Sequence, residues 1–241
     1  MWLQQILLDV QFKDLLNPEF YILHGGLFLI LFIVFAETGL FAGFFLPGDS
    51  LLFVTGIYSQ NFFSLITTQD GKTISPTLSF LNTGNEFLNL LILGMFIVAA
   101  GFVGNEVGYF FGRRIGPAMF SWKDRFLFKK KYLFQAKELY DAKGGMAIIV
   151  ARFIPIARTF APIVAGIVGM DKKKFLYYNL IGCIAWVYSM IFAGHYLYTL
   201  ILKLFNFDLK KHLEVIVLGI VFVTTAPVIY KMIFGKVKSA E

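Results

Sequence analysis

Long apolar stretches separated by short polar or basic segments make up most of this 241-residue chain. Residues 87–112 and 175–202 are continuous apolar runs. A helix needs about 20 such residues to cross the roughly 30 Å hydrocarbon core of a bilayer, so both runs predict spanning helices. Residues 21–36 and 213–234 predict two further spans by the same reasoning.

Another apolar stretch, residues 144–170, is interrupted by Pro155 and Pro162. Each proline removes a backbone donor and clashes with the preceding turn, so a continuous helix is not expected. Split between the two prolines, each arm would be about 15 Å long, half the thickness of a bilayer. Lysines, which mark the cytoplasmic side of spans, flank the stretch at both ends. The pattern predicts a re-entrant hairpin with Arg152 and Arg158 near its tip.

Residues 37–58 form a matching stretch, which is interrupted by the helix-breaking pair Pro47 and Gly48. It predicts a second re-entrant hairpin, and it carries the acids Glu37 and Asp49 where the other hairpin carries arginines. The breakers in both stretches are expected to shape the hairpins rather than to contact a ligand. Interrupted apolar segments at corresponding places in two halves point to a transporter site. The predicted fold is an all-α membrane protein whose spanning helices surround two facing hairpins in an inverted-repeat-like arrangement.

Charged side chains inside these two stretches need partners. On insertion scales, an arginine in hydrocarbon costs about 2.5–3.5 kcal/mol. Arg152 and Arg158 are therefore expected to pair with Glu37 and Asp49 or with an anionic ligand, although the sequence does not say which acid meets which arginine. A purely structural role, in which the four charges hold the hairpins together, stays open at this point.

The remaining segments complete a single membrane domain. Residues 1–18 place apolar side chains on one helical face, which predicts an interfacial amphipathic helix, with a packed core helix as the alternative. No cleavable signal peptide is expected there, because acids stand where a basic region would precede the apolar one. Residues 59–86 are rich in Ser, Thr, Asn and Gly and predict an external loop. Residues 113–143 form a basic segment that predicts the cytoplasmic side.

Composition agrees with a membrane protein and narrows the function classes. The chain is 58% hydrophobic and 18% aromatic, whereas soluble domains are about 45–50% apolar. Its net charge of +7 includes a strong basic cluster in residues 113–143, and a cytoplasmic loop explains this cluster better than a nucleic-acid surface does. The single cysteine excludes an internal disulfide, and the three scattered histidines lack metal-ligand spacing. Without a nucleophile or phosphate-cradle motif, no enzyme activity, cofactor or metal is expected.

Small residues recur every four positions in the second half of the 87–112 helix, which allows a neighbouring helix to approach closely. Polar residues lie within or beside this run at Asn105, Glu106 and Arg113, and Trp186 lies in the 175–202 span. These four residues are secondary candidates for the site. A structural role is slightly favoured for Glu106, near a polar neighbour at the interface.

Several motifs together resemble the DedA family of bacterial membrane proteins, which contains the VTT or SNARE-associated domain. The similarity runs over residues 21–194 and depends on the order and spacing of these residues: Glu37, Pro47-Gly48-Asp49, Gly56, Gly104-Asn105, Gly108-Tyr109, Gly112-Arg113, Arg152-Phe153-Ile154-Pro155, Arg158, Pro162, Ala165-Gly166, Met170, Asn179, Gly182 and Trp186. Asn105 stands where the family often has Asp, which weakens a proton role there. Asp49 stands where many relatives have Glu, which preserves the acid.

The resemblance implies a bacterial inner-membrane flippase that returns undecaprenyl phosphate, a polyprenyl phosphate lipid, for envelope synthesis and depends on the proton-motive force. Arg152 and Arg158 would bind the substrate phosphate, and Glu37 and Asp49 would pair with them and couple transport to protons. The alternative is a proton-coupled ion or small-solute transporter that maintains membrane potential. Membrane lipid and protons are the expected partners, and self-association into a homo-oligomer is left open.

Overall fold

The computed structural model describes residues 18–40, 48–64, 66–67, 73–74, 78–121, 138, 140 and 144–206. Almost all of the predicted amphipathic helix at 1–18 lies outside these residues, as do the predicted span at 213–234, Pro47, and most of the basic segment after residue 121. Helices make up most of the described part, which also contains one pair of two-residue strands.

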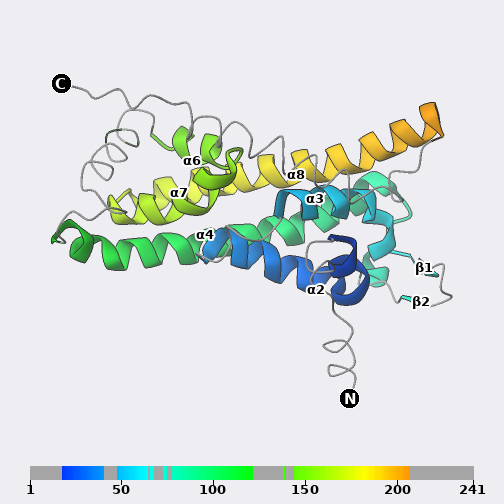
Figure 1. Cartoon of the computed structure of the whole chain (residues 1–241), viewed down its shortest axis with the longest axis horizontal. Coiled ribbons are helices and arrows are strands. Elements are labelled where there is room, and N and C mark those ends of the chain that lie inside the picture. Colours follow the sequence, from blue (N-terminus) through cyan, green and yellow to red (C-terminus); the bar gives the residue numbers. More distant parts are fainter. Residues whose placement is uncertain are drawn as a thin grey trace, which may run out of the picture.

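Two long antiparallel helices, α4 (Glu86–Ser121) and α8 (Lys172–Phe205), extend along the length of the molecule (Figure 1). Both are long and apolar enough to cross a membrane, over Glu86–Gly116 and Lys172–Phe205. This agrees with the spans predicted at 87–112 and 175–202. However, α4 continues past the two arginines at 113–114 to Ser121, so the basic segment begins as helix.

The first interrupted stretch comprises the end of α2 (Pro18–Gly39) and the whole of α3 (Gly48–Ile57). Gly26 has a φ of 54°, a left-handed conformation that bends α2 inside the predicted span at 21–36. The straight apolar part of α2 therefore covers only residues 26–39, fewer than the roughly 20 that a bilayer requires.

The second interrupted stretch consists of α6 (Met146–Ala151) and α7 (Pro155–Ile167). The break falls at residues 152–154, with Pro155 as the first residue of α7, where its missing N–H costs nothing. The prediction that Pro162 breaks the helix was wrong, because it lies inside α7. Its absent N–H leaves the carbonyl of Arg158 without a helical donor, a loss that neighbouring helices in a membrane protein can offset.

The predicted external loop at 59–86 is more structured than its composition indicates. A 3₁₀ turn, η3 (Ser59–Phe62), is followed by the antiparallel pair β1 (Ile66–Thr67) and β2 (Thr73–Ile74) and by a second 3₁₀ turn, η4 (Ser79–Leu81). Phe62, Phe63 and Leu78 are buried in the main hydrophobic core. The beginning of this segment therefore belongs to the packed domain.

The four shorter helices divide between the two long ones. Helices α2 and α7 contact α4, whereas α3 and α6 contact α8. Glycines allow the backbones to meet: a Cβ added to Gly112 on α4 would lie 2.0 Å from the carbonyl oxygen of Ile163 on α7, and one added to Gly56 on α3 would lie 2.2 Å from that of Ile191 on α8. Figure 1 shows α2 and α3 on one half of the long pair and α6 and α7 on the other.

Many large apolar side chains face outward instead of joining the core. Phe28, Phe32, Met95, Tyr177 and Leu204 are each more than 60% exposed. Soluble monomers rarely expose so much apolar surface, whereas a lipid-facing surface requires it. The exposed surface thus agrees with the membrane environment that the composition predicts.

Candidate functional site

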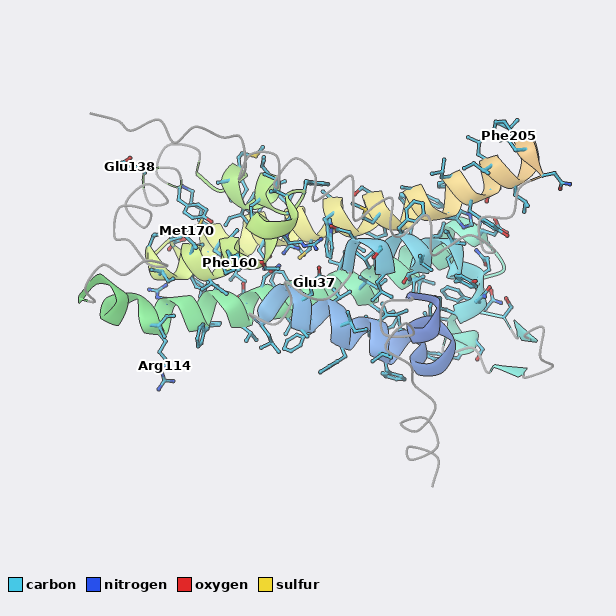
Figure 2. The ribbon with its side chains drawn as sticks, viewed as in Figure 1. Glu37, Arg114, Glu138, Phe160, Met170 and Phe205 are labelled. Carbon is cyan, nitrogen blue, oxygen red and sulfur yellow. The ribbon has the colours of Figure 1, made fainter. Side chains whose placement is uncertain are left out.

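The four charged residues predicted for the site come from four helices or helix ends. Glu37 lies in the last turn of α2, Asp49 in the first turn of α3, Arg152 at the C-cap of α6 and Arg158 in the first turn of α7. Figure 2 places Glu37 near the middle of the molecule, where the first pair of short helices meets the second. The breaks in the two apolar stretches therefore bring acids and bases to one place.

Arg158 bridges both acids. Its Nη2 donates to Oε1 of Glu37, and its Nη1 donates to Oδ1 of Asp49. The side chains of Arg158 and Glu37 are 5% and 1% exposed, and that of Asp49 is 13% exposed. A guanidinium group presents several donors in a fixed planar arrangement, so one arginine can hold two carboxylates at once. This triad of Glu37, Asp49 and Arg158 has a formal charge of −1.

Trp186 on α8 joins this triad to Arg152. Its indole Nε1 donates to Oδ1 of Asp49 at 2.8 Å. The centre of its ring lies 5.0 Å from Cζ of Arg158 and 5.9 Å from Cζ of Arg152, distances at which a guanidinium is attracted to an indole face. The secondary candidate Trp186 is therefore part of the site.

Arg152 is buried without an acid. It is 3% exposed, and among the described residues it forms no ion pair. Its Nη2 donates to Oδ1 of Asn179 at 2.6 Å, while Nε and Nη1 have no hydrogen-bond partner in the described part of the chain. The expected pairing of acids with arginines thus occurs at Arg158 and not at Arg152.

Two buried asparagines extend the site along α4 and α8. Nδ2 of the secondary candidate Asn105 donates to Oδ1 of Asn179 at 2.9 Å, the same oxygen that accepts from Arg152. Asn179 was missed as a site residue by reasoning from the residues alone. It lies seven positions before Trp186 on one helix face, and that spacing was the signal available to find it.

The remaining candidates lie beside the site or away from it. Glu106 is half-buried, and its Oε1 has no hydrogen-bond partner among the described residues. Arg113 is exposed and donates to the hydroxyl of Tyr109 at 2.9 Å, which donates in turn to the carbonyl of Met170 at 2.5 Å. Arg113 therefore belongs to a second polar network that links α4 to the connection between α7 and α8.

Gly48 has a specific role at the centre. A Cβ added there would lie 1.4 Å from Oε2 of Glu37, so the carboxylate occupies the space of the missing side chain. The expectation that Gly48 serves only hairpin geometry is thus incomplete, because it also makes room for Glu37.

This arrangement of two arginines and two acids can bind a charged group and can exchange one ion-pair partner for another. Within the described residues, no group of three or more His, Cys, Asp or Glu side chains is placed to hold a metal ion. The two arginines balance the two acids in formal charge, yet the charges are unevenly paired. Among the described residues, Arg158 has two carboxylate partners and Arg152 has none.

Comparison with known proteins places this chain in a family. The VTT domain matches residues 75–196. The protein DedA of Escherichia coli is 34% identical over 234 residues, covering 97% of this chain and 93% of that protein. An uncharacterized membrane protein of Mycobacterium tuberculosis is 34% identical over 220 residues, covering 89% and 84%.

More distant similarity links the chain to the inner membrane protein YqjA of Escherichia coli, which is 27% identical over 208 residues, 81% of this chain and 77% of that protein. No solved structure gives a significant match. The match to DedA covers nearly the whole chain. Together with the VTT domain and two helices able to span a bilayer, it shows that the chain is a membrane protein of the DedA family.

Proposed function

We propose that this protein moves a polyprenyl phosphate lipid, such as undecaprenyl phosphate, across the bacterial inner membrane. The observation that carries the proposal is the buried guanidinium of Arg152, which has no carboxylate partner and two unpartnered nitrogens in the described structure. A phosphate monoester carries a charge of about −1.5 to −2 at neutral pH and offers several acceptor oxygens. A phosphate group would therefore supply the negative charge and the hydrogen-bond acceptors that Arg152 lacks.

The arrangement of short helices supports a transporter. The pairs α2–α3 and α6–α7 are proposed to be re-entrant hairpins related by an inverted repeat. In the first pair the leading helix packs on α4 and the following helix on α8, and in the second pair these partners are exchanged. Such an exchange is expected when an axis in the membrane plane relates two repeats, and transporters bind substrates where the broken segments meet.

The lipid would leave its tail in the bilayer and bring only its head group to the centre. Arg152 would contact the phosphate first through charge-assisted hydrogen bonds. Arg158 can join only if it releases a carboxylate, since Glu37 and Asp49 occupy two of its nitrogens. Protonation of Glu37 or Asp49 would weaken its hold on Arg158 and free donors for the phosphate. This exchange gives coupling to the proton-motive force a local cause.

The inner-membrane location follows by analogy, because the relative YqjA is named an inner membrane protein. The functional acids and arginines inferred from the family resemblance are those at the centre of this structure. The substrate and its coupling to protons are parts of the proposal, and a separate experiment tests each of them.

A leaflet-access assay tests the proposal. Wild-type protein is reconstituted into liposomes that contain undecaprenyl phosphate, and an added phosphatase hydrolyses the lipid that reaches the outer leaflet. The wild type should expose the inner pool, and Arg152→Gln should not. Arg114→Gln is the matched control, because Arg114 is exposed and its side chain points away from the molecule (Figure 2). A wild type that leaves the inner pool protected would refute the flippase proposal.

Proton coupling is tested with the same liposomes under an imposed pH gradient. Exposure of the lipid by the wild type should depend on the gradient, and Glu37→Gln should lose that dependence because an amide cannot release a proton. If Glu37→Gln keeps the wild-type dependence, Glu37 is not the coupling group. A proton flux that is the same with and without added polyprenyl phosphate would instead favour the proton-coupled ion or small-solute transporter.

A further inference from the structure

Asn179 is a neutral residue that accepts a hydrogen bond from Arg152, whereas two carboxylates accept from Arg158. It is fully buried on α8. Its Oδ1 accepts from Nη2 of Arg152 at 2.6 Å, from Nδ2 of Asn105 at 2.9 Å and, more weakly, from Sγ of Cys183 at 3.7 Å. Its own Nδ2 donates to the carbonyl of Phe102 at 3.4 Å, and these contacts fix which end of the amide faces Arg152.

Other uncharged groups lie against Arg152. Gly182, one turn along α8, leaves space for the arginine, since a Cβ there would lie 2.9 Å from Cδ of Arg152. The ring of Trp186 faces the guanidinium from the next turn. Arg152 is therefore fixed in position by an amide, a glycine and an indole, none of which cancels its charge.

Arg158 shows the opposite arrangement at the same centre. It contacts the same indole ring, but Glu37 and Asp49 both bind its guanidinium. A carboxylate at position 179 would make the two arginines alike, because its oxygen could accept from Arg152 as the amide oxygen does. The amide therefore accounts for the fact that Arg152 is held without being neutralised.

We propose that Asn179 is a positioning residue that keeps Arg152 as the anion-accepting cation of the site, selective for a phosphate monoester head group over a neutral lipid. The proposal rests on the proposed function for the identity of the anion. It goes further by assigning a role to Asn179 and by explaining why an amide, and not an acid, holds this arginine.

The first test needs no ligand. Thermal unfolding is measured for the wild type, Asn179→Asp, Arg152→Leu and the double variant of the full chain in detergent. Asn179→Asp changes the unfolding temperature in both backgrounds. Its effect should be more stabilising, or less destabilising, by about 2–4 °C when Arg152 is present than when leucine replaces Arg152. No difference between the two backgrounds would overturn the proposal, because Arg152 would then offer no open charge to position 179.

The second test measures binding of dodecyl phosphate, with dodecanol as the neutral probe. Fluorescence is read in a Trp2→Phe, Trp122→Phe background, in which Trp186 is the remaining tryptophan of the chain. Asn179→Asp should bind dodecyl phosphate about tenfold to a hundredfold more weakly, the value of a hydrogen bond to a charged group. Asn179→Ala should lose less, because it removes positioning without adding a competing carboxylate.

The controls separate this inference from the proposed function. Asn85→Asp makes the same chemical change at an exposed position and should leave binding unchanged. Binding of dodecyl phosphate to Asn179→Asp as tightly as to the wild type or to Asn179→Ala would overturn the role of Asn179 while leaving the proposed function intact. If the wild type does not bind dodecyl phosphate, the proposed function fails. The thermal unfolding experiment then still determines whether Asn179 lies against an arginine whose charge is not neutralised.

Discussion

Replacement of Gly48 by alanine should destabilise the protein through a side chain on a different helix. The added Cβ would lie 1.4 Å from Oε2 of Glu37 and 2.2 Å from its Cδ, separations that no relaxed structure retains. Either Glu37 leaves Arg158 or α3 moves away from α2. The first response is easier, because Arg158 keeps Asp49 as a partner when Glu37 rotates away.

The cost can be estimated from the interaction that is lost. A hydrogen bond to a charged group contributes about 1.5–3 kcal/mol, and Gly48→Ala should forfeit one such bond. For a chain of this size that corresponds to a fall of about 3–12 °C in unfolding temperature. Thermal unfolding of the purified protein in detergent measures it directly. Lipid exposure in the phosphatase assay should fall as well, because the triad is disturbed.

A double variant identifies the cause. In Glu37→Ala the carboxylate is absent, so adding Gly48→Ala should cost much less than it does in the wild type. Gly101→Ala is the matched control, since its Cβ would meet Cγ1 of Val34 at an ordinary 3.5 Å. Equal costs of Gly48→Ala with and without the Glu37 carboxylate would refute the reasoning, as would a Gly48→Ala protein as stable as the wild type.

Three further substitutions give independent checks. Trp186→Phe keeps an apolar ring but loses the donor to Asp49, so the unfolding temperature and lipid exposure should both fall; wild-type values for both would contradict the geometry. Gly112→Ala should destabilise by about 1–3 kcal/mol in thermal unfolding, because its Cβ would meet the backbone of α7; a stable variant would show that α7 is not packed so closely. Ser59→Ala removes the partner of Nδ1 of His195 at 3.1 Å and should cost about 1–3 kcal/mol in the same assay; a variant as stable as the wild type would contradict this role of Ser59.

The long helices and the interrupted stretches could be predicted from the sequence because they depend on apolar length. Twenty or more apolar residues can hide their backbone only as helix, so α4 and α8 follow from composition. The exact position of the break between α6 and α7, at residues 152–154, is harder to predict from the sequence. A proline is equally compatible with the first position of a helix and with its interior in a membrane, and Pro155 and Pro162 illustrate the two cases.

The site could be predicted as a set of residues but not as a pattern of pairing. Intramembrane charges mark function whatever their partners, so Glu37, Asp49, Arg152 and Arg158 could be named from the sequence. Which carboxylate meets which guanidinium depends on the crossing of helices far apart in the chain. The binding of both acids to Arg158 therefore appears only in three dimensions, as does the neutral support that Asn179 gives to Arg152.

The packing of the short helices divides the central charges between two packing units, one on α4 and the other on α8. Glu37 and Arg158 lie on α2 and α7, which pack on α4, whereas Asp49 and Arg152 belong to α3 and α6, which pack on α8. The Arg158–Asp49 ion pair therefore crosses from one unit to the other, while the Arg158–Glu37 pair stays within a unit. A sliding motion between the units would stretch the first pair and preserve the second. Of the two ion pairs, such a motion would break only the one with Asp49, and it would also stretch the hydrogen bonds of Asn179 to Asn105 and Phe102 between α8 and α4.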